Sequence, residues 1–368
     1  MRVRRNVLAS FLIAAAAFGP PLSAAESDYL GLLRARDLTT FGFLRLDMRP
    51  AHAVHSAPGT WAIETELAHQ NTWALSGGAR DYLDGLSGGR RSLGPDEVED
   101  ILALPGENYV LDMELAQLDV TLHYKFTEHW GGYLVMSGVN YSGGFLDSAI
   151  ENFHDVFGFD DNARPAVEQN AVNLIADLNN ANIAVFDAPT SGGLLDPTIG
   201  VRYSSPQQLK GWNFVVEAAA KLALQGEEEF LSTGKSDYGV QATLQRFGDH
   251  HAWYVSASAV YYDGRSSITP TDPQVIPTLV LGYERKLSDR THLVLQGYVS
   301  DSIYSKKDTQ LNELLDTKLQ LSLGIYWRMG RSVVSFAFTE NLQNFNNTPD
   351  VGLQLGWAYS PALAKTSD

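Results

Sequence analysis

The feature that most constrains the fold is strict alternation of apolar and polar residues between Lys318 and Thr339. Side chains on a strand point to opposite faces in turn, so each arm has one apolar face and one small or polar face. Met329-Gly330-Arg331 divides the stretch into two arms. Each arm is about ten residues long, which is the length of a tilted strand that crosses a bilayer. The stretch therefore predicts a transmembrane β-hairpin.

The same alternation recurs along most of the chain. The expected strands lie within residues 61–68, 109–126, 133–141, 199–203, 212–222, 238–245, 253–261, 279–284, 293–299, 319–327, 334–338 and 351–359. Short connections follow the even-numbered strands and longer ones follow the odd-numbered strands, as in outer-membrane barrels. The sequence therefore predicts an all-β fold, a transmembrane antiparallel up-and-down β-barrel of about twelve strands, located in the cell outer membrane.

A soluble β-protein is the alternative interpretation. Against it, the face opposite the apolar one is rich in Gly, Ser, Gln, Thr and paired charges, as expected of a barrel interior. Aromatic rings favour the membrane–water boundary. The rings expected at strand ends are Trp61, Tyr124, Phe126, Trp130, Trp253, Trp327, Trp357 and Tyr359. These features favour the membrane barrel.

The chain begins with the pattern of an export signal. Arg2, Arg4 and Arg5 precede an apolar run over residues 7–18, and small residues follow at 23–25. We expect a signal peptide over 1–25, an N-terminal segment over 26–58, the barrel over 59–360 and a tail over 361–368. Cys is absent, which excludes disulfides and a lipid-attachment cysteine.

Charge and location suggest the partners. Without the signal, 24 basic residues face 43 acidic ones, a net charge of −19, which excludes nucleic acid as a partner. We expect contacts with outer-membrane lipid and lipopolysaccharide, and with periplasmic chaperones and the barrel-assembly machinery during biogenesis. A small-molecule solute is a further candidate partner.

The N-terminal segment allows two interpretations. It is either a periplasmic extension or a plug inserted in the lumen, and its basic residues are the plug candidates: Arg34, Arg36, Arg45 and Arg49. In the second interpretation these arginines pair with carboxylates of the lumen.

Two strands depart from clean alternation. The apolar phase of residues 109–126 slips near Gln117, which we interpret as a β-bulge because a one-residue slip reverses every later side chain. In the next strand we assign Tyr133, Val135, Val139 and Tyr141 to the apolar face, although Leu134 and Met136 make the other face less polar than expected.

The longest connection, residues 143–197, is expected outside the cell and contains a short helix over 145–157. The helix has an apolar stripe that we expect to pack on the loop or the barrel rim: Leu146, Ile150, Phe153 and Phe157. We expect His154 at the surface. Weak calcium candidates follow: Asp155, Asp160, Asp161 and Asn162. Their spacing matches no defined calcium loop, so no metal or other cofactor is expected.

Two stretches carry a family resemblance. Residues 31–54 and 145–158 resemble recurring segments of an uncharacterised Gram-negative outer-membrane family known only as a domain of unknown function. The resemblance implies a membrane barrel and brings no catalytic residue with it.

The favoured function is a narrow, porin-like channel or uptake protein for small solutes. The lumen-lining candidates are Glu64, Glu66, Asp119, His123, Lys125, Arg202, Glu217, Lys221, Glu284 and His292. Mixed charges on a pore wall sort solutes by size and charge. One alternative is a structural or ligand-binding barrel acting through its long external loop. Another is a lipid hydrolase using His69 and Ser137, both assigned to apolar-face positions, but no catalytic constellation supports enzymatic activity.

Overall fold

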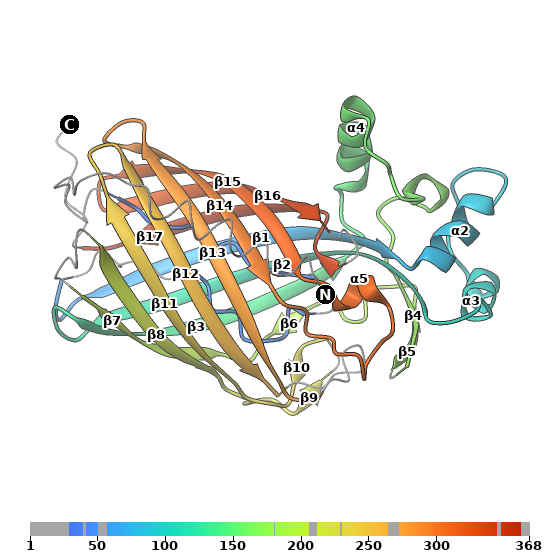
Figure 1. The fold of residues 1–368 in the computed structure, drawn as a ribbon, viewed down its shortest axis with the longest axis horizontal. Helices are drawn as coiled ribbons and strands as arrows, with labels where there is room; N and C mark the ends of the chain where they lie inside the picture. Colours follow the sequence, from blue (N-terminus) through green and yellow to red (C-terminus); the bar gives the residue numbers. More distant parts are fainter. Residues whose placement is uncertain are drawn as a thin grey trace, which may run out of the picture.

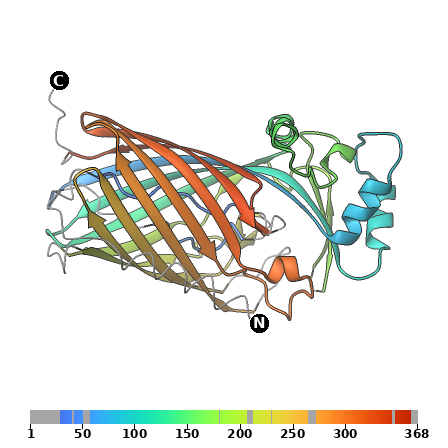
Figure 2. The same ribbon diagram turned by 45° about the horizontal axis from the view of Figure 1, so that its top comes forward.

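Twelve antiparallel strands form a closed barrel in the computed structural model (Figures 1 and 2). The structure describes residues 29–39, 42–50, 57–179, 181–205, 212–228, 230–263, 272–343 and 347–361. The barrel strands, in spatial order, are β1 (Trp61–Leu75), β2 (Asn108–Lys125), β3 (Trp130–Ser142), β7 (Thr198–Ser204), β8 (Asn213–Lys221), β11 (Asp237–Phe247), β12 (His251–Tyr262), β13 (Gln274–Lys286), β14 (Thr291–Ser300), β15 (Lys318–Met329), β16 (Ser332–Gln343) and β17 (Val351–Tyr359).

The first and last strands close the barrel. β1 pairs with β2 on one side and with β17 on the other, where Ile63 lies opposite Tyr359. Closure leaves no open sheet edge, which is the condition for strands to cross a bilayer. The turns β2–β3, β11–β12, β13–β14 and β15–β16 are short and lie at the end where β1 begins and β17 ends (Figure 1). We call this the short-turn end, periplasmic in outer-membrane barrels, and the other the loop end. The predicted fold is confirmed.

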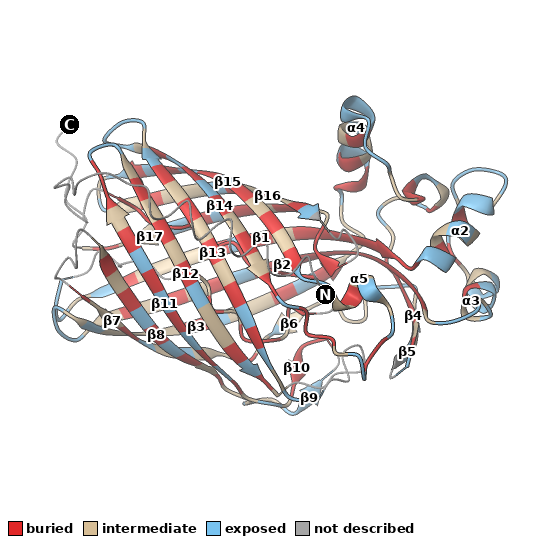
Figure 3. Cartoon of the chain, in the orientation of Figure 1, coloured by how far each residue is buried: buried red, intermediate tan, exposed pale blue. Residues whose placement is uncertain are grey.

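The outer surface of the barrel is apolar and the interior is polar. Leu118, Val240 and Leu355 are 48%, 59% and 55% exposed on the outer face, whereas Gln241 and Thr243 are buried facing inward. Burial therefore alternates along the strands (Figure 3). So much exposed apolar surface far exceeds the few hundred Å² found in contiguous patches on soluble monomers, so this face contacts lipid. Among the described residues, no helix is long and apolar enough to cross a membrane.

The predicted aromatic residues all lie toward one end of the barrel. Trp61 begins β1 and its ring lies 4.6 Å from that of Tyr124, near the end of β2. Trp130 contacts Tyr203 at 5.1 Å, also at the short-turn end. The loop end has a sparser set, in which Tyr238 and Tyr261 are exposed and lie opposite each other. The rings thus form one dense girdle at the short-turn boundary.

The predicted bulge at Gln117 is wrong. The register of β2 against both β1 and β3 runs without a shift through this residue. The apparent slip arises because the interior of the barrel changes from polar to apolar along this strand. Gln117 and Asp119 face a polar lumen, whereas Leu115 and Met113 face an apolar core at the loop end. The apolar residues therefore keep the inward phase. This loop-end core includes Tyr109, Leu111, Met113, Leu115, Tyr141, Leu174, Phe230, Leu231, Tyr262, Ile303, Tyr304 and Leu314.

The predicted orientation of the third strand is also wrong. Tyr133 and Val135 lie on the same face as Asp119 and Thr121, since Val135 is the register partner of Thr121, and this face is the lumen. Met136 is 46% exposed and faces lipid. Val139 and Tyr141 pack on the loop-end core and Tyr133 packs against Leu46 and Met48 of the N-terminal segment, so hydrophobicity does not distinguish the two faces here.

Additional elements lie at the loop end (Figures 1 and 2). They are α2 (Gly77–Gly85), α3 (Pro95–Leu102), α4 (Asp147–Phe157), η2 (Arg164–Ala166), β4 (Asn173–Leu178), β5 (Ala181–Val185), β6 (Gly193–Leu194), β9 (Glu227–Glu228), β10 (Ser232–Thr233) and α5 (Asn312–Leu315). α4 is the helix expected in the long connection, and its Leu146 and Ile150 pack on Val351 at the rim. β4 extends the sheet by pairing with the outer part of β2. The expected signal peptide and most of the tail lie outside the described residues.

Candidate functional site

The N-terminal segment occupies the lumen. Tyr29 lies at the short-turn end, where its ring stacks on Phe247 at 5.4 Å and its hydroxyl donates to the carbonyl of Gly248. Phe43 reaches the loop-end core and contacts Tyr141 at 5.9 Å. The chain then returns, since Arg34 Nη1 donates to the carbonyl of Pro50 at 2.6 Å. Residues 29–39 and 42–50, here called the plug, thus enter and leave through the same mouth.

Three plug arginines bind carboxylates on the adjacent strands β1 and β2. Arg34 Nε lies 2.9 Å from Glu64 Oε1, and Arg36 Nη2 lies 2.7 Å from Asp119 Oδ2. Arg49 Nη1 lies 3.4 Å from Glu66 Oε2 and 3.5 Å from Asp119 Oδ2. A charge in the interior is costly unless it is paired, so these contacts hold the plug against one side of the wall.

The tip of the plug is held by a second set of charges. Lys318 Nζ, only 1% exposed, lies 2.5 Å from Asp37 Oδ2 and donates to Thr39 Oγ1 at 2.9 Å. Arg45, the fourth plug candidate, lies 3.8 Å from Asp37 and donates to the Tyr298 hydroxyl at 2.9 Å. The sequence interpretation missed Asp37 and Lys318. The inward phase of Lys318 with Gln320 and Ser322 was the available signal, whereas no pattern marks Asp37.

Glu284 binds the start of the plug. Its two carboxylate oxygens accept the backbone N–H groups of Leu30 and Gly31, each at 2.9 Å. The Tyr254 hydroxyl donates to the same carboxylate at 2.6 Å, and His292 Nδ1 lies 2.5 Å from it. The buried carboxylate of Glu284 on β13 therefore binds the plug and one side chain from each of the neighbouring strands β12 and β14.

All ten lumen-lining candidates lie on the inner face of the wall, and several pair with one another. His123 contacts Glu64 at 3.2 Å, and Arg202 lies 2.6 Å from Glu217. Lys221 lies 2.9 Å from Asp237 and donates to the carbonyl of Leu44 at 2.7 Å. The tenth candidate, Lys125, lies toward the short-turn mouth and lines a small cavity with Arg202 and Tyr133.

Glycines of the wall make room for the plug. A Cβ added at Gly239 would come within 2.6 Å of Met48 Sδ, and one at Gly324 within 2.6 Å of Leu33 Cδ2. At Gly282 it would overlap Leu32 Cδ2. These glycines lie on alternate strands β11, β13 and β15, so their shared role is to leave room for plug side chains against the wall.

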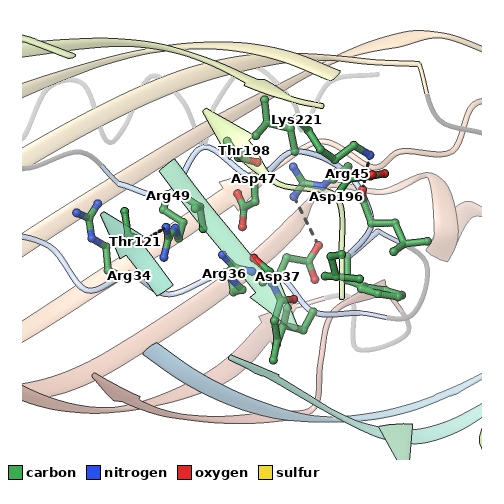
Figure 4. Close-up of a pocket in the computed structure, with 18 of the residues that line it drawn as sticks. Arg34, Arg36, Asp37, Arg45, Asp47, Arg49, Thr121, Asp196, Thr198 and Lys221 are labelled. Carbon is green, nitrogen blue, oxygen red and sulfur yellow. Dashed lines mark hydrogen bonds and ion pairs between the residues drawn. The ribbon is translucent and has the colours of Figure 1, made fainter. Parts of the chain in front are cut away.

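A cavity of about 70 Å³ remains beside the plug (Figure 4). Figure 4 shows Arg34, Arg36 and Arg49 from the plug near Thr121 of β2. A volume this small holds a few water molecules.

His69 and Ser137 lie on opposite faces of the wall. His69 Nε2 lies 2.5 Å from Glu114 Oε2 on the outer face, where its ring stacks on Phe145 at 4.9 Å. Ser137 faces the lumen and donates to Asp119 Oδ1 at 2.5 Å. The two residues proposed for a hydrolase therefore cannot act together in this arrangement.

A groove of about 520 Å³ lies outside the barrel, between the long loop and the outer ends of β1 and β16. It is lined by Trp73, Arg80, His154, Phe159, Asp160, Asp161, Asn162, Glu340, Asn341, Leu342 and Asp350. Arg164 of the long loop pairs with Asp147 of α4 (2.5 Å) and with Asp350, the residue before β17 (2.7 Å), and donates to Asn71 of β1 at 3.2 Å. The loop that forms one side of the groove is therefore held in place by ion pairs.

Three of the four calcium candidates, Asp160, Asp161 and Asn162, line this groove, where the two carboxylates already have partners. Asp160 lies 2.5 Å from Arg80, and the Asn162 N–H and this guanidinium hold the pKa of Asp160 below its usual value. Asp161 lies 2.9 Å from His154, which is 9% exposed and so is not the surface histidine expected. Asp155 lies on α4 at the surface. No group of three ligating side chains suited to a metal occurs within the described ranges.

Comparison with known proteins gives a family and several similar folds. A family model described as "Protein of unknown function (DUF3187)" matches residues 101–360, and no curated protein matches the sequence. The COG4313 outer membrane channel from Pseudomonas putida F1 has a TM-score of 0.47 and 9% identity, over 86% of this chain and 98% of that one. The P. putida toluene transporter TodX has a TM-score of 0.38 and 10% identity, over 82% and 90%. The CymD monoaromatic hydrocarbon channel has a TM-score of 0.36 and 10% identity, over 83% and 89%.

Proposed function

The chain belongs to the DUF3187 family of proteins of unknown function, and we propose that it is a gated channel of the outer membrane for small polar solutes, closed at rest by its plug. The observation that carries the proposal is the path of the plug, which enters and leaves the lumen through the short-turn mouth. A segment with both ends at one mouth can withdraw without being threaded through the barrel.

The size of the barrel supports a channel. Eight-stranded barrels are filled by their own side chains and sixteen-stranded ones leave an aqueous pore, so a twelve-stranded barrel lies between. Here the remaining space is filled by a segment that precedes the first strand. Much of its contact with the wall is polar, and because water replaces these contacts when they break, a hydrogen bond to a charged group contributes a net of only about 1.5–3 kcal/mol.

The plug also completes the closure at the loop end. Leu38 and Phe43 belong to the loop-end core, together with Phe230 and Tyr304 from the loops. Withdrawal of the plug would remove two members of this core from the inside. One movement would therefore clear the polar middle of the lumen and loosen its apolar outer closure.

Electrical recording tests this function directly. Purified full-length protein in planar bilayers should be silent or open briefly, and a variant lacking residues 29–50 should conduct steadily. Circular dichroism of the β-barrel serves as the folding control. Silence of both proteins, with the barrel intact, would exclude a channel.

Ligand binding by the long loop is a second candidate function, favoured by the external groove. Glu340 lies on the outer face of β16, and its buried Oε2 has no hydrogen-bond partner among the described residues. The lining contains four carboxylates but only one arginine and one histidine, so a cationic ligand fits best. Calorimetry with benzyltrimethylammonium would detect such binding, and loss of the heat in Glu340→Gln would assign it to the groove.

A further inference from the structure

We propose that the open channel selects small cations, because withdrawal of the plug uncovers carboxylates that its arginines neutralise. This inference rests on the channel function proposed above. It concerns the sign of the charge that faces a solute once the lumen is clear.

The uncovered carboxylates lie together on β1 and β2. Glu66 and Asp119 are direct register partners, and Glu64 lies two residues along β1 on the same face. All three are bound by guanidinium groups of the plug, at 2.7 to 3.5 Å. The plug thus supplies the counter-ions for this part of the wall and shows that planar cations fit beside it.

Most other lumen charges keep their partners when the plug leaves. The Arg202–Glu217 and Lys221–Asp237 pairs each join two residues of the wall. Glu284 keeps His292 and the Tyr254 hydroxyl. Among the described residues of the wall, Lys318 is the cation that loses its carboxylate partner, Asp37, and it lies at the loop end of β15.

The net charge of the lumen therefore becomes more negative. The plug carries four arginines against Asp37 and Asp47, so its departure removes two positive charges. The buried middle of the described wall then holds six carboxylates and three basic side chains: Glu64, Glu66, Asp119, Glu217, Asp237 and Glu284, against Arg202, Lys221 and Lys318.

Basic side chains also occur at the short-turn mouth, where Lys125, Lys286 and Arg328 lie at the ends of their strands. Lys125 is four residues from Thr121, the register partner of Glu64, and this separation corresponds to about 13 Å along β2. That distance exceeds the Debye length of about 10 Å at 0.1 M salt, so these charges are largely screened from the middle of the lumen. The carboxylates of β1 and β2 therefore set the sign of the potential in the middle of the lumen.

Selectivity follows from the local potential. A potential of −1 kT enriches monovalent cations and depletes anions by the same factor, giving a permeability ratio of about sevenfold, and charged clefts reach several kT. The expected solutes are small cations such as alkali ions, primary amines and guanidines. Small anions should be excluded although Arg34, Arg36 and Arg49 line the closed lumen.

The test uses the full-length chain with Arg34→Gln, Arg36→Gln and Arg49→Gln together, which removes the guanidinium partners of the three carboxylates and favours plug withdrawal. The current reversal potential in a KCl gradient should show K⁺ preferred over Cl⁻ by about sevenfold or more. Adding Glu64→Gln, Glu66→Gln and Asp119→Asn should abolish the preference while conduction remains. Glu99→Gln, at an exposed position of α3 outside the lumen, is the matched control and should leave the preference unchanged.

Rare openings of the wild-type protein at high voltage provide a second measurement if the triple variant folds poorly, and they should show the same preference. Conduction without cation preference would overturn this inference and leave the channel function standing. Silence of the wild type, the triple arginine variant and the plug deletion would instead overturn the channel function itself.

Discussion

Replacement of Lys318 by methionine should release the tip of the plug. Lys318 and Asp37 are 1% and 2% exposed, and their charged atoms lie 2.5 Å apart. Without the lysine, Asp37 keeps Arg45 at 3.8 Å and its contacts with Thr39. Removal of one partner from a buried ion pair costs about 3–5 kcal/mol when the remaining charge is left unpaired, so with Arg45 still beside Asp37 the cost should lie near the lower limit. At 1.4 kcal/mol per tenfold change, the docked plug should be disfavoured by roughly 10².

A single cysteine measures this effect because the natural chain has none. Leu38→Cys places a thiol at a buried position of the tip, where a membrane-impermeant maleimide should react slowly. Labelling should accelerate strongly when Lys318→Met is added. Lys307→Met is the control, since Lys307 pairs with Asp272 at 2.7 Å but is solvent-exposed, and exposed pairs contribute little.

A double substitution separates charge from packing. Asp37→Asn with Lys318→Met removes the buried charge that Lys318→Met leaves behind, so labelling should return toward the slow wild-type rate. Equal labelling rates for Lys318→Met and the wild type would refute the role of this ion pair. Fast labelling of the double substitution would show that removing the Asp37 charge does not restore docking, since Arg45 then loses its carboxylate as well.

Three further perturbations test other parts of the structure. Gly282→Leu should speed labelling at residue 38 because its side chain overlaps Leu32, whereas Gly297→Leu should not, because nothing lies within 4 Å of that site. Arg164→Met should expose the long external loop to protease, with a cost to loop docking of about 3–5 kcal/mol, while unchanged protection would contradict the role of its ion pairs. Leu355→Lys should lower the free energy of unfolding in lipid vesicles by about 2–4 kcal/mol, and no change would contradict the lipid-facing assignment.

The fold was predictable because one periodicity governs nearly every strand. Leu323 and Ile325 face lipid and Ser322 and Gly324 face the lumen, as their alternation indicates. The same rule places all ten lumen candidates inward. The alternation can be read from local sequence alone, because lipid on one side of the wall and the polar lumen on the other differ in polarity.

The rule fails where both sides of a strand are apolar. At the loop end the interior is a protein core, so Leu115 and Tyr141 face inward although they are hydrophobic. The bulge at Gln117 and the reversed face of β3 both arise from this change. The partners of the plug could not be paired from the sequence, because Asp37 meets Lys318 across 281 residues without any local pattern.

The position of the plug bears on how the molecule is assembled. Leu30 and Gly31 are synthesised among the first residues, yet their Glu284 acceptor lies 254 and 253 residues later in the chain. Contacts of such long range form slowly because a large loop must close before they stabilise anything. The N-terminal segment therefore stays undocked until most of the wall has been synthesised. The strands then close around it. If β1 paired with β17 before the N-terminal segment had entered the lumen, the plug would be left outside the closed barrel.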